Sequence, residues 1–184
     1  MFGNIPLFKP TGGGGGGGAG GVSLRWYEPD SLGPVKALAS SGLEYYAFNN
    51  TEEQSIYAML KVPTSYVAGT QIFLKSGLFY SSVNTGNVKF LASTYIFDAN
   101  IDATSLPTGY NSTNAQQAVN GTANRLSVLS DIDLTNATGQ INSVAVQPGD
   151  LLFIVLVRDT SAETSGAAAD VNLLIDSFEP SFSA

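Results

Sequence analysis

The chain has 184 residues with a net charge of −7, and only 12% are charged, against about 25% in typical globular proteins. Its eight lysine and arginine residues are scattered, so we expect neither a nucleic-acid partner, which needs a basic patch, nor binding to an anionic membrane. The absence of cysteine and histidine excludes Ser-His-Asp and Cys-His catalysis, disulfide bonds and cysteine-ligated metals, and argues against a structural zinc site.

The N-terminal segment combines an apolar peptide with a glycine tether. Residues 1–10 lack the basic and long apolar regions of a signal peptide, so we expect a protein used without secretion. Seven consecutive glycines at 12–18 have no side chains to bury, which predicts a disordered or extended arm over 1–22. The apolar end of this arm is suited to ordering in a groove on another subunit. With the aromatic pair that follows, the candidate partner-binding residues are Phe2, Ile5, Leu7, Phe8, Trp26 and Tyr27.

Strand signals recur along 23–184, which we expect to form one domain. Apolar alternation and turn sequences such as 84–87 favour short antiparallel strands, and 36–39 could form at most one helical turn. This pattern predicts an all-β antiparallel sandwich of about eight strands, a jelly roll or related Greek key. The predicted strands are 23–27, 43–48, 54–62, 70–80, 88–97, 126–134, 141–146, 151–157 and 171–178, with a weaker one at 115–119.

The stretch 151–157 stands out because all seven of its residues are apolar and turn residues precede it at 148–150. It is too short to cross a bilayer, which needs about 20 apolar residues. It is therefore predicted to be a strand in the middle of a sheet, buried on both faces. The cover of its outer face would be the segment 23–40 or a symmetry mate.

Two acidic motifs are candidate functional sites. Asp131 and Asp133 would lie about 7 Å apart on one strand, a spacing seen in glycoside hydrolysis, but alternation alone explains them as a solvated face. No acid with a raised pKa can be nominated. The run 98–102 starts like a calcium loop, yet Ala103 and Gly109 stand where glycine and glutamate are required. We therefore predict no catalytic, cofactor-binding or metal site, and no enzyme.

Aromatic side chains are the remaining candidates for ligand contacts. They could stack on sugar rings in a lectin-like sandwich, although packing in the core or at a subunit interface is the default for residues on strands. They are Trp26, Tyr27, Tyr45, Tyr46, Tyr57, Tyr66, Tyr80, Tyr95 and Tyr110.

Three stretches carry a resemblance to a known family: LRWYEPDSLGPVKALA (24–39), LKVPTSYVAGTQI (60–72) and SVAVQPGDL (143–151). Over about residues 24–176 the chain resembles small virion proteins of tailed bacteriophages. The resemblance implies a jelly-roll homotrimer made in the host cytoplasm and placed on the capsid surface. Its implied role is a decoration (cement) protein that binds the major capsid protein. The alternative is a fibre-type or carbohydrate-binding module that contacts host glycans.

Overall fold

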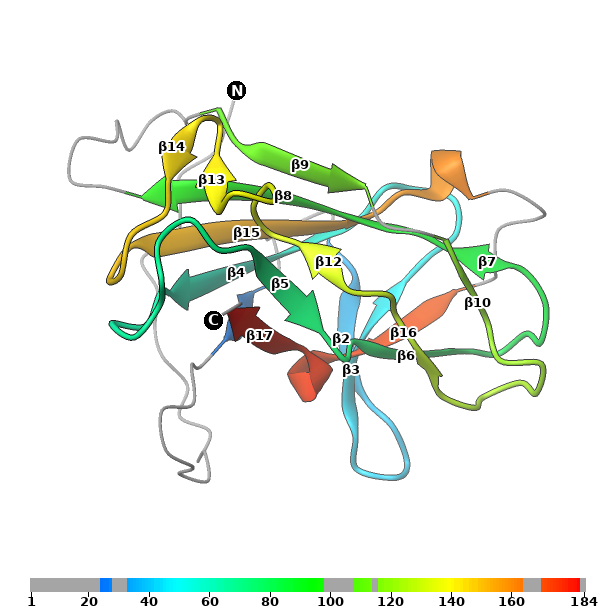
Figure 1. Ribbon diagram of the computed structural model, residues 1–184. Helices are drawn as coiled ribbons and strands as arrows, with labels where there is room; N and C mark the ends of the chain where they lie inside the picture. The colour runs from blue at the N-terminus through cyan, green and yellow to red at the C-terminus, as the bar shows by residue number, and fades with distance from the viewer. Residues whose placement is uncertain (1–23, 28–32, 98–107, 114–115, 164–169, 183–184) are drawn as a thin grey trace.

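The computed structural model describes residues 24–27, 33–97, 108–113, 116–163 and 170–182, and these form an all-β protein (Figure 1). The described residues contain two short 3-10 turns, Thr160–Ala162 and Ile175–Ser177, and no α-helix. In this part of the chain, no helix has the length and apolarity needed to span a membrane. The predicted arm over 1–22 and the calcium-like run at 98–102 lie outside the described residues.

Two five-stranded antiparallel sheets form the body of the protein (Figure 1). Sheet A has the order β1 (Arg25–Tyr27), β4 (Ser55–Lys61), β15 (Leu151–Arg158), β8 (Phe90–Phe97) and β9 (Tyr110–Thr113). Sheet B has the order β11 (Ser127–Val128), β6 (Leu78–Ser81), β16 (Val171–Leu174), β3 (Glu44–Phe48) and β2 (Val35–Leu38).

Three smaller groups of strands complete the structure. One contains β12 (Ile132–Asp133), β5 (Ile72–Lys75) and β17 (Glu179–Phe182), in that order. The others are the pairs β7 (Asn87–Val88) with β10 (Gln117–Ala118), and β13 (Gln140–Ile141) with β14 (Val144–Ala145).

The order of the main strands confirms the predicted sandwich and its eight-strand jelly-roll pattern. The strands β3, β6, β11 and β16 lie in sheet B, whereas β4, β8, β9 and β15 lie in sheet A. The chain therefore crosses repeatedly between the sheets. Within them the orders β3-β16-β6-β11 and β4-β15-β8-β9 are those of a double-sheet jelly roll.

The core fills the space between the sheets because alternate residues of each strand point inward. On β15 the inward residues Leu152, Ile154 and Leu156 are fully buried. From the opposite layer, Phe48 of β3 meets Phe90 of β8 edge-on, with 5.2 Å between ring centroids.

The prediction that 151–157 lies mid-sheet is confirmed, since β15 pairs with β4 and β8 along its length. The prediction of burial on both faces is wrong for the outer face. There the odd-numbered residues Leu151, Phe153 and Val155 are only half-buried. Their neighbours on this face shield them in part, and no second layer of described residues covers them.

The predicted strand 70–80 is divided between two sheets. The break falls at Ser76, whose φ of 61° is left-handed, and at Gly77. A Cβ at Gly77 would lie inside van der Waals contact of the Phe178 ring. Glycine therefore lets the chain pass close to this buried ring as it turns from β5 into β6.

Two other segments can be compared with their expectations. The segment 36–39, which could form at most one helical turn, forms none: 36–38 belong to the edge strand β2, which pairs with β3. The predicted strand 126–134 is also divided: β11 joins sheet B and β12 joins β5. Its inward face changes between the two parts, so Val128 is 56% exposed whereas Leu129 is buried.

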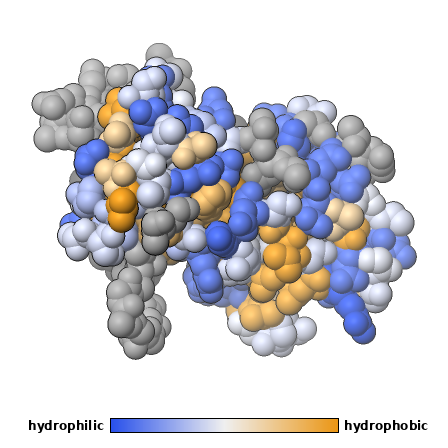
Figure 2. All heavy atoms as spheres, viewed as in Figure 1, coloured by the Kyte–Doolittle hydropathy of each residue, from blue (hydrophilic) through white to orange (hydrophobic). Residues whose placement is uncertain are grey.

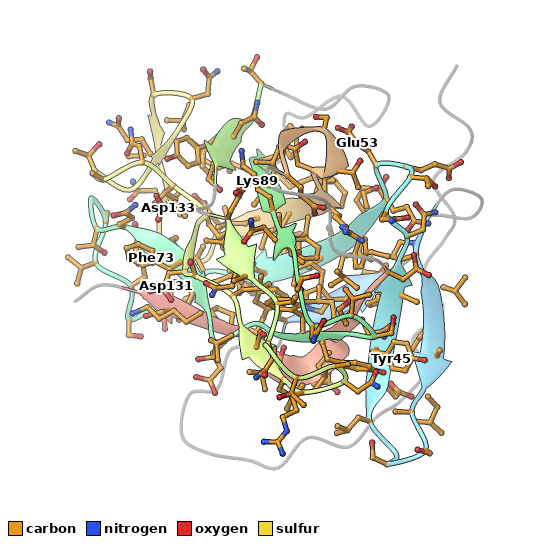
Figure 3. All side chains as sticks on the ribbon, turned by 90° about the vertical axis from the view of Figure 1, so that its right-hand side faces the viewer. Tyr45, Glu53, Phe73, Lys89, Asp131 and Asp133 are labelled. Atoms are coloured by element: carbon orange, nitrogen blue, oxygen red, sulfur yellow. The ribbon has the colours of Figure 1, made fainter. Side chains whose placement is uncertain are left out.

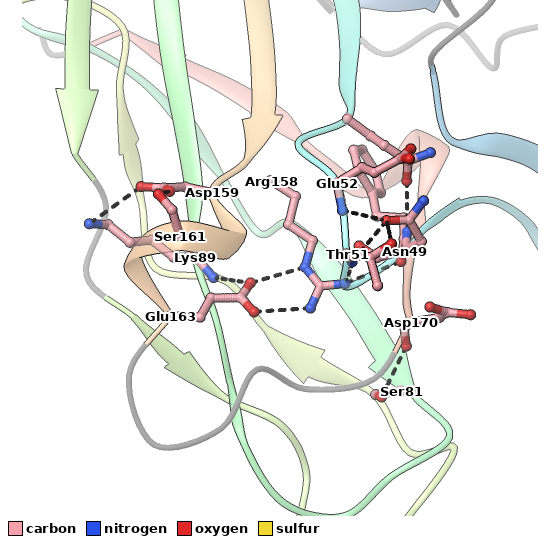
Figure 4. Close-up of polar contacts among 12 residues, drawn as sticks. Asn49, Thr51, Glu52, Ser81, Lys89, Arg158, Asp159, Ser161, Glu163 and Asp170 are labelled. Carbon is pink, nitrogen blue, oxygen red and sulfur yellow. Dashed lines mark hydrogen bonds and ion pairs between the residues drawn. The ribbon is translucent and has the colours of Figure 1, made fainter.

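A buried ion pair fixes one end of β15 (Figure 4). The Arg158 side chain donates from Nε and Nη2 to the two carboxylate oxygens of Glu163, each at 3.0 Å, and both side chains are 0% exposed. Nη1 of Arg158 donates to the carbonyls of Phe48 at 3.2 Å and Asn49 at 2.9 Å. Glu163 also accepts from the backbone N–H of Lys89 at 3.2 Å. This network, the Arg158 clamp, joins β15 to the ends of both layers.

We predict that Arg158→Met destabilises the fold by about 3–5 kcal/mol, because it leaves the Glu163 carboxylate buried without its partner. Urea unfolding followed by circular dichroism measures the loss. The double variant Arg158→Met/Glu163→Met should regain part of it, since no unpaired charge remains. A single variant within 1 kcal/mol of the parent on the same scale would contradict this account.

We also predict that Gly77→Ala costs about 1–3 kcal/mol of stability through overpacking against Phe178. The ring centroids of Phe178 and Trp26, the only tryptophan, lie 5.4 Å apart. The emission maximum of Trp26 should therefore shift as the Phe178 ring is displaced. Gly121→Ala is the matched control, because no atom lies within 4 Å of an added Cβ there. An unchanged emission maximum in Gly77→Ala would show that the ring does not move.

Candidate functional site

The outer face of sheet A carries a continuous group of large apolar side chains. Strand register places Tyr57 beside Val155, and Met59 beside Phe153, on this side of the sheet. Phe153 in turn pairs with Tyr95, and Leu151 pairs with Phe97. We call this surface the sheet A face; its central residues, all half-buried, are Tyr57, Met59, Leu91, Tyr95, Phe97, Leu151, Phe153, Val155 and Val157.

Phe153 is the centre of an aromatic cluster on this face. Its ring is stacked on Tyr57 at 5.5 Å with an interplanar angle of 13°. It meets Phe97 edge-on at 5.4 Å and Tyr95 at a tilt at 6.2 Å. The rings belong to three adjacent strands, so cross-strand pairing holds the cluster in place.

The sheet A face also carries polar groups. Ser93, in the middle of β8, lies beside Val155, and its Oγ donates to Asn111 Oδ1 at 2.7 Å. Lys61, exposed at the C-terminal end of β4, is the only charged residue among the described side chains that the register places on this face. The face is therefore mainly apolar, with one hydrogen-bonded polar pair on its β8–β9 side.

The structure separates the two described candidates for partner binding. Tyr27 pairs with Tyr57 and so lies on the outer side of sheet A, next to the aromatic cluster. Trp26 pairs with Ala58 on the inner side and packs against the core and Phe178. The other four candidates, Phe2, Ile5, Leu7 and Phe8, lie outside the described residues.

Sequence reasoning did not single out the aromatic cluster as a site. It names Tyr57 and Tyr95 among aromatics expected to pack in the core or at a subunit interface, and it does not name Phe97 or Phe153 among them. The sequence signal for an apolar outer face is the unbroken apolar run 151–157. A strand with one exposed face normally alternates apolar and polar residues, whereas this run has apolar residues on both faces.

Sheet B presents a second, less organised apolar surface. Val35 is 67% exposed and Leu38 is 66% exposed on the edge strand β2, and Leu43 is 46% exposed in the following turn. Figure 2 shows hydrophobic atoms running down toward the end of the β2–β3 hairpin. Tyr45 and Tyr80 meet edge-on at 5.6 Å on this sheet. Burial, followed by the charge and hydrogen bond of Tyr45, raises the pKa of Tyr80.

The acidic pair lies elsewhere, beside β5 (Figure 3). Lys75 Nζ lies 3.8 Å from Asp131 and 5.5 Å from the centroid of the Phe73 ring. Burial, and then the neighbouring Asp131 charge, raises the pKa of Asp133. The expectation that no acid with a raised pKa can be nominated is thus wrong, because distant strand segments come together around Asp133.

A neighbour of Asp133 also has a shifted pKa. Burial and the Asp133 charge raise the pKa of Tyr110, which disfavours its ionised form. Asp131 is exposed and paired with Lys75. Within the described part of the chain, no three acidic residues group in a way that could hold a metal ion.

We predict that Asp133→Asn slightly stabilises the protein at pH 7. A raised pKa means that the native state penalises the charged form, so the penalty is present above the native pKa and is lost as pH falls through it. Because Asp133 is half-exposed, the gain should not exceed about 0.5 kcal/mol, and it should vanish below the ordinary pKa of 3.8. Thermal unfolding from pH 3 to 8, with Glu53→Gln as an exposed control, measures it; a variant less stable than the parent at pH 7 would contradict the sign.

Comparison with known proteins gives a neighbour in fold only. No protein-family model matches the chain, and no curated protein matches it. Among solved structures it is similar to TmCBM61, a carbohydrate-binding module determined in complex with beta-1,4-galactotriose. The TM-score is 0.41 and the identity 14%, over 87% of this chain and 88% of that chain. The similarity is too distant to carry a statement about function.

Proposed function

We propose that the protein is a structural virion component that forms homotrimers and reinforces the phage head by binding the major capsid protein. The virion assignment is supported by the sequence resemblance described above. The proposal that the protein assembles is supported by one observation, the sheet A face centred on Phe153. Monomeric proteins seldom expose continuous apolar patches larger than a few hundred Å², and the largest patch on a protein surface is often a functional one.

The energy available from covering this face is of the same order as the stability of a small domain. Burial of apolar surface contributes about 25 cal/mol per Å², and aromatic side chains carry the most area. With 12% charged residues, few charges would need to lose water on assembly. In this proposal, the neighbouring copy supplies the cover of the face.

The geometry of the rings favours a protein partner over a sugar. A sugar-stacking platform presents free ring faces with hydrogen-bonding groups beside them, whereas the Phe153 ring is stacked on Tyr57 and meets Phe97 edge-on. In the nearby polar pair, the Ser93 hydroxyl already donates to Asn111. Glycan binding is therefore the alternative, and direct titration separates the two.

We predict that Phe153→Ser lowers the fraction of trimer at micromolar concentration and leaves the sandwich folded, because Phe153 lies outside the core. Analytical ultracentrifugation measures association, and circular dichroism checks the fold. Val128→Ser, at a 56% exposed position on sheet B, is the matched control and should not change association. A stable monomer of the parent protein at micromolar concentration would overturn the trimer.

The virion role is tested on purified particles. The protein should occupy regular capsid lattice positions in electron cryomicroscopy maps, and deletion of residues 1–21 should abolish attachment while the isolated domain stays folded. If the truncated protein occupies the capsid positions normally, the arm is not needed for attachment. Saturable binding of beta-1,4-galactotriose, lost in Phe153→Ser, would instead favour the glycan-binding alternative.

A further inference from the structure

We propose that residues 2–8 of one copy lie across the sheet A face of a neighbouring copy, so that the trimer is held together by exchanged N-terminal arms. This inference rests on the homotrimer proposed above. It names the part of the neighbouring copy that covers Phe153 and the residues around it.

The size of the face fits a short peptide better than a globular surface. The central apolar residues occupy β4, β15 and β8, a width of about 14 Å at about 4.8 Å per strand. An eight-residue strand such as β15 is about 26 Å long, so the apolar area is about 350 Å². A stable subunit interface needs about 800 Å² from each partner. A peptide of seven extended residues reaches about 24 Å, close to the length of β15.

The chemistry of the peptide also fits the face. Residues 2–8 contain Phe2, Ile5, Leu7 and Phe8 and no charged side chain. The face is apolar at its centre, with Lys61 at one end. Pro6 lacks a backbone N–H, so the peptide can donate fewer backbone hydrogen bonds than a regular strand and depends more on contacts of its apolar side chains.

The tether gives the peptide the necessary reach. Fifteen residues, 9–23, separate the peptide from the first described residue, and a glycine-rich chain of this length has a root-mean-square span of about 20 Å. They lead into β1, the edge strand of sheet A. A contact that leaves one copy and enters the next closes into a ring of three when the rotation between copies is 120°, and every arm and every face is then used once. The three linked contacts then act with high effective concentration.

Engineered disulfide bonds test this arrangement cleanly, because the natural chain contains no cysteine. A tagged copy carrying Leu7→Cys is mixed with an untagged copy carrying Val155→Cys, the mixture is allowed to exchange subunits and is then oxidised. A tagged–untagged product on a non-reducing denaturing gel is expected. The matched control replaces the Val155→Cys copy with an untagged copy carrying Val128→Cys, on sheet B. This mixture should give no tagged–untagged product.

Three further measurements separate this inference from its alternatives. In a double Leu7→Cys/Val155→Cys chain, oxidation should give linked dimers and trimers; closure within a single chain only would overturn the exchange. Equal linkage to Val155→Cys and Val128→Cys would overturn the docking site. Deletion of residues 1–21 should convert the trimer to monomer, and a trimer that persists would overturn the role of the arm. Because these measurements use the isolated protein, absence from virions would refute the virion role without affecting them.

Discussion

The pairing of β15 with both β4 and β8 is the constraint on which the rest of the structure depends. Leu151 to Val157 match residues on both sides without interruption, so the register of sheet A is set by one strand. Even-numbered residues then enter the core and odd-numbered residues form the centre of the sheet A face. A shift of one residue would exchange the two sets, and Phe153 would replace Ile154 against the opposite layer.

The Arg158 clamp holds the end of that strand. Arg158 closes the C-terminal end of β15 and reaches the carbonyls that follow β3, so one side chain joins both layers of the sandwich. The Gln54 side chain accepts from the Asn49 N–H at 2.7 Å and donates to Gly33 O, which ties the segment before β2 to the same end of the molecule. The core sets which residues point inward, and this polar network fixes how the strand ends meet.

Local patterns in the sequence predicted the sandwich, its central strand and most other strands, because alternation and turn residues are local properties. They did not predict the division of 70–80, since serine has no preference for the left-handed conformation that Ser76 adopts. The raised pKa of Asp133 depends on burial by segments distant in sequence, which periodicity cannot reveal. For the aromatic cluster, the apolar run around Phe153 was recognised, but the sequence alone did not show that its outer side remains half-exposed.

The edge strands of the two sheets are short in the part of the chain that the structure describes. Strands β1 and β11 have three and two residues, and β2 and β9 have four each. Lys36 of β2 and Glu44 of β3 form an exposed ion pair at 3.1 Å beside the exposed Val35 and Leu38. Short strands and an edge lysine disfavour the lateral addition of further strands, which would produce open fibres. The faces of the sandwich are then the surfaces left for the proposed association, and contacts there can close into a particle of fixed size.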